Sequence, residues 1–289
     1  MERFSRLFIL ITLCTATMFA DASYNEVTRF TGGTMVDMLR NLAASPIGRF
    51  AGHGMSNALQ DQTSTVYIKG SKMARVGQTS TTIIDLDAGT ITTIQNEHRT
   101  YSVMTFDQMQ EAMSRGQRGR PVSDIKFDIK VEPTTNTKMI DGQTATETLS
   151  TLTATSPDAN GATMVVHADY WMVPDESGSN EIREFTRKLA TRYQGMAEGN
   201  PMMGAASKGI SAAIAEGMKR GGYPVQIKTT ISGVSSPMAG MTGRSGGNSG
   251  DPNAPFLIME SQYSNFASGP VDDSRFAIPE GYKNKTRER

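Results

Sequence analysis

The chain has 289 residues, and its 29 Lys and Arg balance 29 Asp and Glu, so the formal net charge at pH 7 is zero. A balanced charge argues against nucleic-acid binding, which needs a clustered basic surface. Hydrophobic residues make up 37% of the chain, which suits a folded domain, and no stretch after residue 22 offers the roughly 20 apolar residues of a membrane-spanning helix.

The N-terminal region has the three parts of a secretory signal peptide. Two arginines form its basic start, residues 7–13 (LFILITL) its apolar core, and residues 20–22 (Ala-Asp-Ala) the small residues that a signal peptidase reads. We predict that residues 1–22 are a signal peptide cleaved before Ser23, and that the protein is periplasmic or secreted. A membrane anchor, the alternative, would need a longer apolar run.

Cys14 is the only cysteine of the chain. Lipidation of Cys14 would favour a small residue just before it, and Leu13 is not small, so removal with the signal peptide is the preferred interpretation. The mature chain 23–289 would then contain no thiol for a disulfide, a nucleophile or a zinc–thiolate site.

A short helix is predicted over residues 31–44, with a glycine-rich loop at 45–57 after it. We take residues 23–60 as an N-terminal helix and loop that precede the main domain. The apolar residues of the helix share one face at three- and four-residue spacing: Met35, Met38, Leu39 and Leu42.

From residue 62 the apolar residues recur with a period of two, which is typical of β-strands. Strands of five or six residues alternate with tight turns, so antiparallel hairpins are expected. The turns are predicted at Gly70-Ser71, at Asp87-Ala88-Gly89 and at Asn96-Glu97-His98.

A helix is predicted next over residues 106–114, because Thr105 and Gln108 have the spacing of a capping box. The residues after it, 115–121 (RGQRGRP), are expected to form a basic loop. One face of the helix carries Phe106, Met109 and Met113.

A second group of strands begins near residue 124, where apolar residues alternate cleanly with polar ones up to Val131. An Asp141-Gly142 turn then precedes the strand TATETLSTLTATS, and the turn SPDANG precedes the strand ATMVVHADYWMV. Pro174 is expected to end the last of these strands.

Two further helices are predicted at 181–194, capped by Asn180, and at 205–219, ended by Gly221-Gly222. Their apolar stripes are Ile182, Phe185, Leu189 and Tyr193 in the first helix, and Ile210, Ile214 and Met218 in the second.

The last strands are GGYPVQIKTTIS and FLIMESQYSNFA, and the Gly-, Ser- and Pro-rich residues 233–255 between them indicate a flexible insertion. Residues 283–289 are expected to be a disordered basic tail. The order of elements predicts one α+β domain over residues 61–282, built on a large antiparallel sheet.

Several of these segments resemble, in order, one family of bacterial domains. VYIKGSKMARV and TTIIDLDAGTITTIQNEHRTYSVMTFDQM are similar to its opening hairpins, TNTKMIDGQTATET to its middle strand, and TMVVHADYWMVPD to a strand ending carried by Trp171 and Asp175. GGYPVQIKT and FAIPEGYK are similar to its closing motifs. The family is the domain of unknown function 4412, and the resemblance covers roughly residues 60–282. The residues that match the closing motifs are Gly222, Pro224, Phe276, Pro279, Gly281 and Tyr282.

The resemblance implies the fold of the periplasmic LolA/LolB-like lipoprotein carriers. That fold is a curved, half-open β-barrel with helices across its open face, around an apolar groove. The family brings no catalytic residues with it. The insertion at 233–255 and the basic loop at 115–121 depart from a simple carrier.

The residues that could carry chemistry are scattered. His53, His98 and His167 lie in a loop, a turn and a strand, without the spacing of a metal site. Asp85 and Asp87 share a strand face, but a solvated face and a hairpin turn account for them. The motifs of serine hydrolases, P-loops and dinucleotide-binding folds do not occur, so we expect a non-catalytic protein with no metal and no cofactor.

The 19 methionines fit two interpretations, because methionine fills irregular cores and also lines surfaces that accept variable apolar ligands. Burying an acyl chain of about sixteen carbons would gain on the order of 12 kcal/mol before ordering costs. No polar motif is needed for such binding.

The leading hypothesis is therefore an exported periplasmic protein that holds a lipid, an acyl chain or another apolar ligand between sheet and helices. The alternatives are a non-catalytic structural or interaction protein of the cell envelope, which would contact a protein partner through its loops and basic tail, and a hydrolase with an unfamiliar site. The expected groove residues are Phe106, Met109, Met113, Trp171, Phe185, Leu189, Ile210, Ile214 and Met218.

Overall fold

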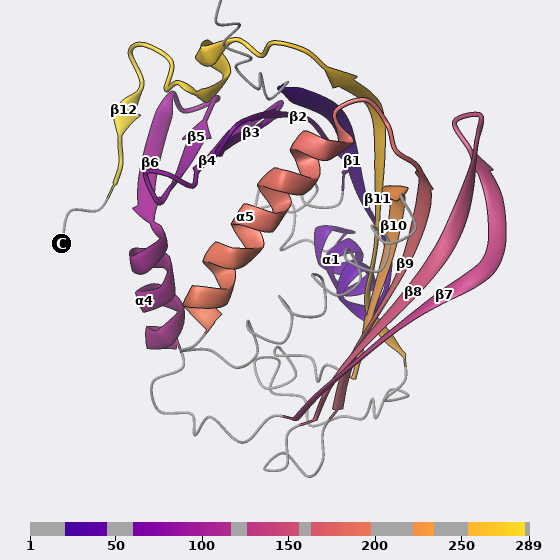
Figure 1. Cartoon of the computed structure of the whole chain (residues 1–289). Helices are drawn as coiled ribbons and strands as arrows, with labels where there is room; N and C mark the ends of the chain where they lie inside the picture. The colour runs from indigo at the N-terminus through magenta and orange to yellow at the C-terminus, as the bar shows by residue number, and fades with distance from the viewer. Residues whose placement is uncertain are drawn as a thin grey trace, which may run out of the picture.

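The computed structural model describes six stretches of the chain, and the predicted helix 205–219, the loop 45–57 and the turn SPDANG lie outside them. Within these stretches, a single curved sheet carries helices α1 (Thr34–Ala44), α4 (Phe106–Gly116) and α5 (Ser179–Ala197) on its inner side (Figure 1). The described residues are 21–44, 60–116, 126–155, 163–197, 222–233 and 254–286.

The sheet has twelve strands in the order β12-β6-β5-β4-β3-β2-β1-β11-β10-β9-β8-β7. Neighbouring strands run antiparallel, except that β12 and β6 run parallel. The order is linear, so the sheet curves without closing, and the prediction of a large antiparallel α+β sheet is confirmed at this level.

One half of the sheet is a meander in which each strand pairs with the next along the chain. Its turns lie at residues 70–71, 86–89 and 96–99, so the predicted hairpins are confirmed. The strands are β2 (Gln62–Lys69), β3 (Lys72–Gly77), β4 (Ser80–Asp85), β5 (Thr90–Gln95) and β6 (Thr100–Thr105).

Helix α4 begins where the sequence predicts, directly after β6. The backbone N–H of Gln108 donates to the Thr105 hydroxyl at 3.1 Å, and the Thr105 N–H donates to the Gln108 side chain at 3.0 Å. This reciprocal pair satisfies two backbone donors that the first helical turn leaves open, so the capping box is confirmed.

The other half of the sheet consists of longer strands. The hairpin between β7 and β8 turns at Asp141 and Gly142, whose φ angles are 48° and 81°, as a two-residue turn between antiparallel strands requires. The strands are β7 (Lys126–Ile140), β8 (Gln143–Thr155), β9 (Thr163–Pro174), β10 (Gly222–Ser232) and β11 (Pro255–Ser268).

Strand β1 (Ala22–Gly32) joins the two halves, because it pairs with β2 on one side and with β11 on the other. The sequence pattern predicted no strand there, and the boundary expected at residue 60 does not divide the sheet. The helix predicted over 31–44 is confirmed in shorter form as α1, which packs against β1 and β11.

Helix α5 lies across the inner side of β1 and β2. Its start is fixed at Gly178, whose φ is 81°, because a Cβ at this position would lie only 2.9 Å from both Ala22 Cβ and the Ala267 carbonyl oxygen. Only glycine fits such a close approach in this backbone conformation, so the helix begins against the first residue of β1.

The C-terminal segment covers the outer side of the β2–β6 half. The short helix η1 (Asp273–Phe276) and β12 (Lys283–Asn284) bring Phe276 and Tyr282 onto a buried cluster of Ala74, Ile83 and Ile94. The prediction of a disordered tail from residue 283 is wrong up to residue 286, because β12 pairs with β6 and the Thr286 hydroxyl accepts from the Val103 N–H at 2.9 Å.

Candidate functional site

Four of the predicted groove residues come together where α4 and α5 meet the sheet. Phe106 and Phe185 are 4% and 1% exposed, and Met109 and Leu189 pack against the same cluster. These side chains therefore fill a core between helices and sheet. Met113 lies in α4, in a part whose side chains the structure does not describe, and Ile210, Ile214 and Met218 lie outside the described residues.

Trp171 is not a member of this cluster: it packs against a second cluster of Ala145, Val173 and Val225, and Phe266 contacts both clusters. Adjacent strand residues face opposite sides of a sheet, and the inner side of β9 carries Tyr170. Trp171 faces outward with the Lys138 ammonium 3.9 Å above its ring centroid, and it lies opposite Glu147 and Gln226 in register. A signal was available in the sequence, because Trp171 shares its period-two face with the polar Asp169.

The inner face of β7–β11 is uncharged and combines apolar side chains with hydroxyl groups, among them Thr148, Ser150 and Ser261, and it is partly buried. Tyr170 and Ala168 are buried, with Val131, Met172 and Ile227 packed around them. The strand register aligns further half-buried side chains on the same face, where β7 to β11 and β1 lie side by side: Phe127, Ile129, Val166, Ile231, Leu257, Met259 and Phe30.

Charge is sorted strictly between the two faces of these strands. The register of β7–β11 places every described Asp, Glu, Lys and Arg of these five strands on the outer face. Lys126, Asp128, Lys130 and Glu132 alternate along β7 there, and Asp169, Lys228 and Glu260 follow on β9, β10 and β11. The inner face is thus an uncharged surface facing the interior of the curved sheet.

One carboxylate borders this uncharged surface. Glu26 on β1 points to the inner side, is 7% exposed, and its Oε2 atom makes no hydrogen bond with the described part of the chain. The Arg75 guanidinium lies 3.0 Å from that atom, with the geometry of an ion pair rather than a hydrogen bond. The Oε2 atom is therefore held by charge attraction to Arg75 on the inner side of the sheet.

Aromatic rings surround Glu26 on the same side. Tyr24 meets Tyr263 edge-on at 5.9 Å between ring centroids and stacks on Phe266 at 5.7 Å, and Tyr223 meets Phe266 edge-on at 4.9 Å. We call these five residues, including Glu26, the Glu26 cluster. It connects β1, β10 and β11 at the boundary between the filled core and the uncharged face.

The tyrosines of the Glu26 cluster stay protonated over a wide pH range. Burial, followed by the negative charge of Glu26, raises the pKa of Tyr24 from 10.0 to about 12. Burial raises the pKa of Tyr263 and Tyr223 as well, with Glu26 adding to both shifts. Neutral hydroxyls next to a carboxylate can donate and accept hydrogen bonds, which suits a polar end group more than acid–base catalysis near neutral pH.

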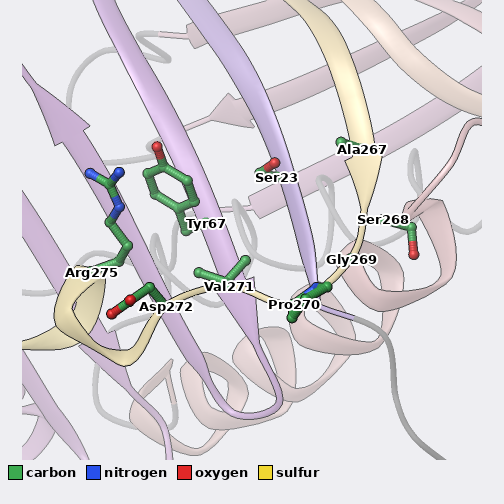
Figure 2. A pocket seen from close by; sticks show the side chains of 9 residues that line it. All are labelled: Ser23, Tyr67, Ala267, Ser268, Gly269, Pro270, Val271, Asp272 and Arg275. Atoms are coloured by element: carbon green, nitrogen blue, oxygen red, sulfur yellow. The ribbon is translucent and has the colours of Figure 1, made fainter.

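A shallow hollow opens on the outer side, where β1, β2 and β11 meet the segment leading to η1. Figure 2 shows the residues that line it, among them Val271 and Tyr67, with Arg275 and Asp272 together at one side of the view. Its volume is about 290 Å³, and the Arg275 guanidinium lies 4.9 Å from the centre of the Tyr67 ring. The Asp272 carboxylate caps η1 by accepting from the Ser274 N–H at 2.7 Å, so it already has a structural role. We therefore interpret the hollow as a gap between packed segments and not as a binding site.

The side chains of the described residues do not gather into a metal site. These residues contain no group of three or more His, Cys, Asp or Glu side chains arranged to hold a metal ion. Among the described helices, none combines the length and the apolar character needed to cross a bilayer.

Comparisons with known proteins give no family assignment. No protein-family model matches the chain, and no curated protein matches its sequence. The resemblance to the domain of unknown function 4412 family therefore stays a prediction.

Proposed function

We propose that the chain is an exported, non-catalytic binding protein of the periplasm, and that it holds a lipid, an acyl chain or a similar apolar ligand against the inner face of β7–β11. The signal-like residues 1–22 support export. Phe106, Met109, Phe185 and Leu189, the described helix residues among those expected to line a groove, pack into a core, so the proposed site lies on the strands.

A single observation carries this proposal: the uncharged, half-buried inner face of β7–β11. Soluble proteins rarely leave a large apolar surface without a partner. Apolar side chains lie here beside hydroxyls such as those of Thr148 and Ser150, and no described charged side chain of β7–β11 would lose its hydration when a ligand binds to this face. Val131, Val166 and Ile227 offer such a surface within the curve of the sheet.

The curved, unclosed sheet with helices on its inner side is compatible with a LolA/LolB-like carrier. In that arrangement, the ligand's apolar chain would lie along β9 and β10. A polar end group would reach the Glu26 carboxylate, which is paired with Arg75, and the neutral hydroxyls around it. An amphiphile with a hydrogen-bond donor at one end fits this combination.

Neighbouring valines on β9 provide a matched test. Val166 faces inward opposite Leu152 and Ile231, whereas Val165 faces outward opposite Thr153 and Ser232, and both are half-buried. We expect Val166→Asn to weaken binding of a dansyl-labelled fatty acid at least about fivefold, because an unpaired amide is costly in an apolar site. Val165→Asn should bind as the wild type does.

Native mass spectrometry of protein purified from membranes adds a second measurement, in which a co-purified lipid should appear as added mass. Absence of both bound lipid and probe fluorescence in the wild-type protein would refute the proposal. Equal losses in both valine variants would also count against it, because they would show general damage to β9.

A further inference from the structure

Strand β7 is one end of the sheet, and no described element pairs with its outer edge (Figure 1). Over residues 126–132 it is regular, with β8 as its partner on the other side. Such an edge presents a row of unpaired backbone N–H and C=O groups. Natural sheets protect edges of this kind or use them to bind another strand.

The side chains along this edge form a self-complementary pattern. Residues 126–132 read KFDIKVE, with Phe127, Ile129 and Val131 on the inner face and four charged residues on the outer face. When the order of the segment is reversed, Glu132 falls at the position of Lys126 and Lys130 at the position of Asp128, while apolar residues fall at the positions of apolar residues.

We propose that two copies of this chain pair β7 to β7 in antiparallel fashion about a two-fold axis at Ile129, which joins two sheets into one. Lys126 then faces Glu132 of the partner subunit, and Asp128 faces Lys130 of the partner subunit. Phe127 faces Val131 of the partner subunit on the inner side. Opposite charges across antiparallel strands stabilise the pairing, and the interface is of the isologous kind that two-fold symmetry requires.

The charge pattern selects this register over its neighbours. A shift of two residues in one direction sets Lys126 against Lys130 and Asp128 against itself. The opposite shift sets Asp128 against Glu132 and Lys130 against itself. Shifts by one residue would set apolar side chains of one copy against charged side chains of the other. Among the registers that pair at least five of residues 126–132, only this one sets opposite charges against each other.

The structure also limits how far the pairing extends. Pro133 has no N–H to donate, and the register of β7 against β8 is interrupted between Pro133 and Thr137. At about 3.4 Å per residue, the paired segment is about 24 Å long. Lys130 and Glu132 already form an exposed ion pair at 2.8 Å within one copy; pairs of this kind contribute little, so the dimer extends this row of charges at little cost.

Charge exchange tests the proposal by sedimentation equilibrium over roughly 1–500 µM protein, the range suited to a short interface. We expect the wild type to dimerise, and Asp128→Lys or Lys130→Asp alone to raise the dissociation constant at least about tenfold, because each sets like charges opposite each other. The double variant D128K/K130D restores opposite charges and should dimerise again. A mixture of the two single variants should form a heterodimer.

Two controls keep these outcomes decisive. The charge variants change exposed side chains, and circular dichroism should show an unchanged fold. Glu184→Lys changes an exposed carboxylate of α5 and should leave the dimer intact. A wild type that stays monomeric up to the highest concentration overturns the proposal, and so do single variants that dimerise like the wild type. The proposal rests on the strand register and holds whether or not the protein binds lipid.

Discussion

The ion pair of Glu26 and Arg75 joins β1 to β3 across the intervening strand, with 3.0 Å between the charged atoms. The Glu26 side chain is only 9% exposed, whereas Arg75 is 48% exposed. Replacing Arg75 by Met would leave the buried carboxylate without a counter-charge. We expect the free energy of unfolding to fall by about 1–3 kcal/mol, below the value for fully buried pairs because Arg75 is half in solvent.

Lys72 on the same strand is the matched control. Its side chain is also 48% exposed and lies 3.4 Å from Asp85, which is a more accessible partner. Lys72→Met should change the free energy of unfolding by less than about 0.5 kcal/mol. Urea unfolding of both variants at neutral pH measures the difference. Equal effects would show that the burial of Glu26 does not matter.

The tyrosines of the Glu26 cluster predict a loss of stability in alkali. The pKa of Tyr24 is raised to about 12 from 10.0, so between these pH values the folded state holds a proton that the unfolded state has released. The stabilising contribution is complete below pH 10 and is lost as the pH rises toward 12, by up to about 1.4 kcal/mol per pH unit for each such group.

Tyr24→Phe isolates this contribution. The variant should show a shallower fall in the free energy of unfolding between pH 9.5 and 11.5 than the wild type, measured by urea titrations at each pH. Absorbance of tyrosinate supplies an independent readout, because Tyr24 should ionise only as the protein unfolds. Identical slopes for the two proteins would contradict the raised pKa of Tyr24.

At the scale of elements, β1 begins inside the segment that the sequence assigned to the signal peptide. Ala22 is fully buried and pairs with Ile68 and Ser268. The Asp21 carbonyl accepts from the Gly269 N–H at 2.9 Å, and the Asp21 carboxylate accepts from the Val271 N–H at 2.7 Å. The start of β1 thus holds the end of β11 and the segment after it.

A chain that starts at Ser23 should therefore be less stable than one that starts at Asp21. The loss of two hydrogen bonds and of one buried side chain predicts a difference of about 1–3 kcal/mol. Chemical denaturation of the two truncated proteins measures it, and a third protein starting at Ala20 should match the one starting at Asp21. Equal stability of all three would mean that residues 21 and 22 add nothing to the sheet.

The sequence allowed the elements with regular patterns to be predicted. The hairpins of β2–β6, the capping box of α4 and the Asp141-Gly142 turn depend on local residues alone. Strand β1 escaped prediction because its inner face alternates Tyr24, Glu26 and Thr28, which shows no apolar period. The two-residue strand β12 escaped because its partner β6 is remote in sequence, and remote pairing leaves no local pattern.

The candidate site was predicted only in part, for a similar reason. Strand β9 carries large apolar residues on both faces, and only the polar His167 and Asp169 on the face of Trp171 indicate that Tyr170 faces inward. Helix periodicity correctly grouped Phe106 with Met109 and Phe185 with Leu189. It could not show that the two pairs pack together into one core, because that depends on how α4 and α5 lie relative to each other.

At the scale of the whole molecule, the two halves of the sheet have different surroundings. The β2–β6 half is covered by α4 and α5 on the inner side and by the C-terminal segment on the outer side. The β7–β11 half keeps its inner face half-buried and its outer face charged. This difference accords with the proposed binding function, because only the β7–β11 half leaves an uncharged, partly exposed face for a ligand.

The place of β1 in the middle of the sheet has a consequence for how the chain matures. Thr28 and Ser261 share a hydrogen bond of 3.0 Å although 233 residues separate them. A chain made from its N-terminus produces β1 first and the matching edge of β11 almost last, and closing so long a loop slows folding. Until β11 is made, the meander of β2–β6 can form, but the edge of β1 that later pairs with β11 stays unpaired. We therefore expect chaperones to bind this unpaired edge of β1 during synthesis, and the pairing of β11 with β1 to be the last step of folding.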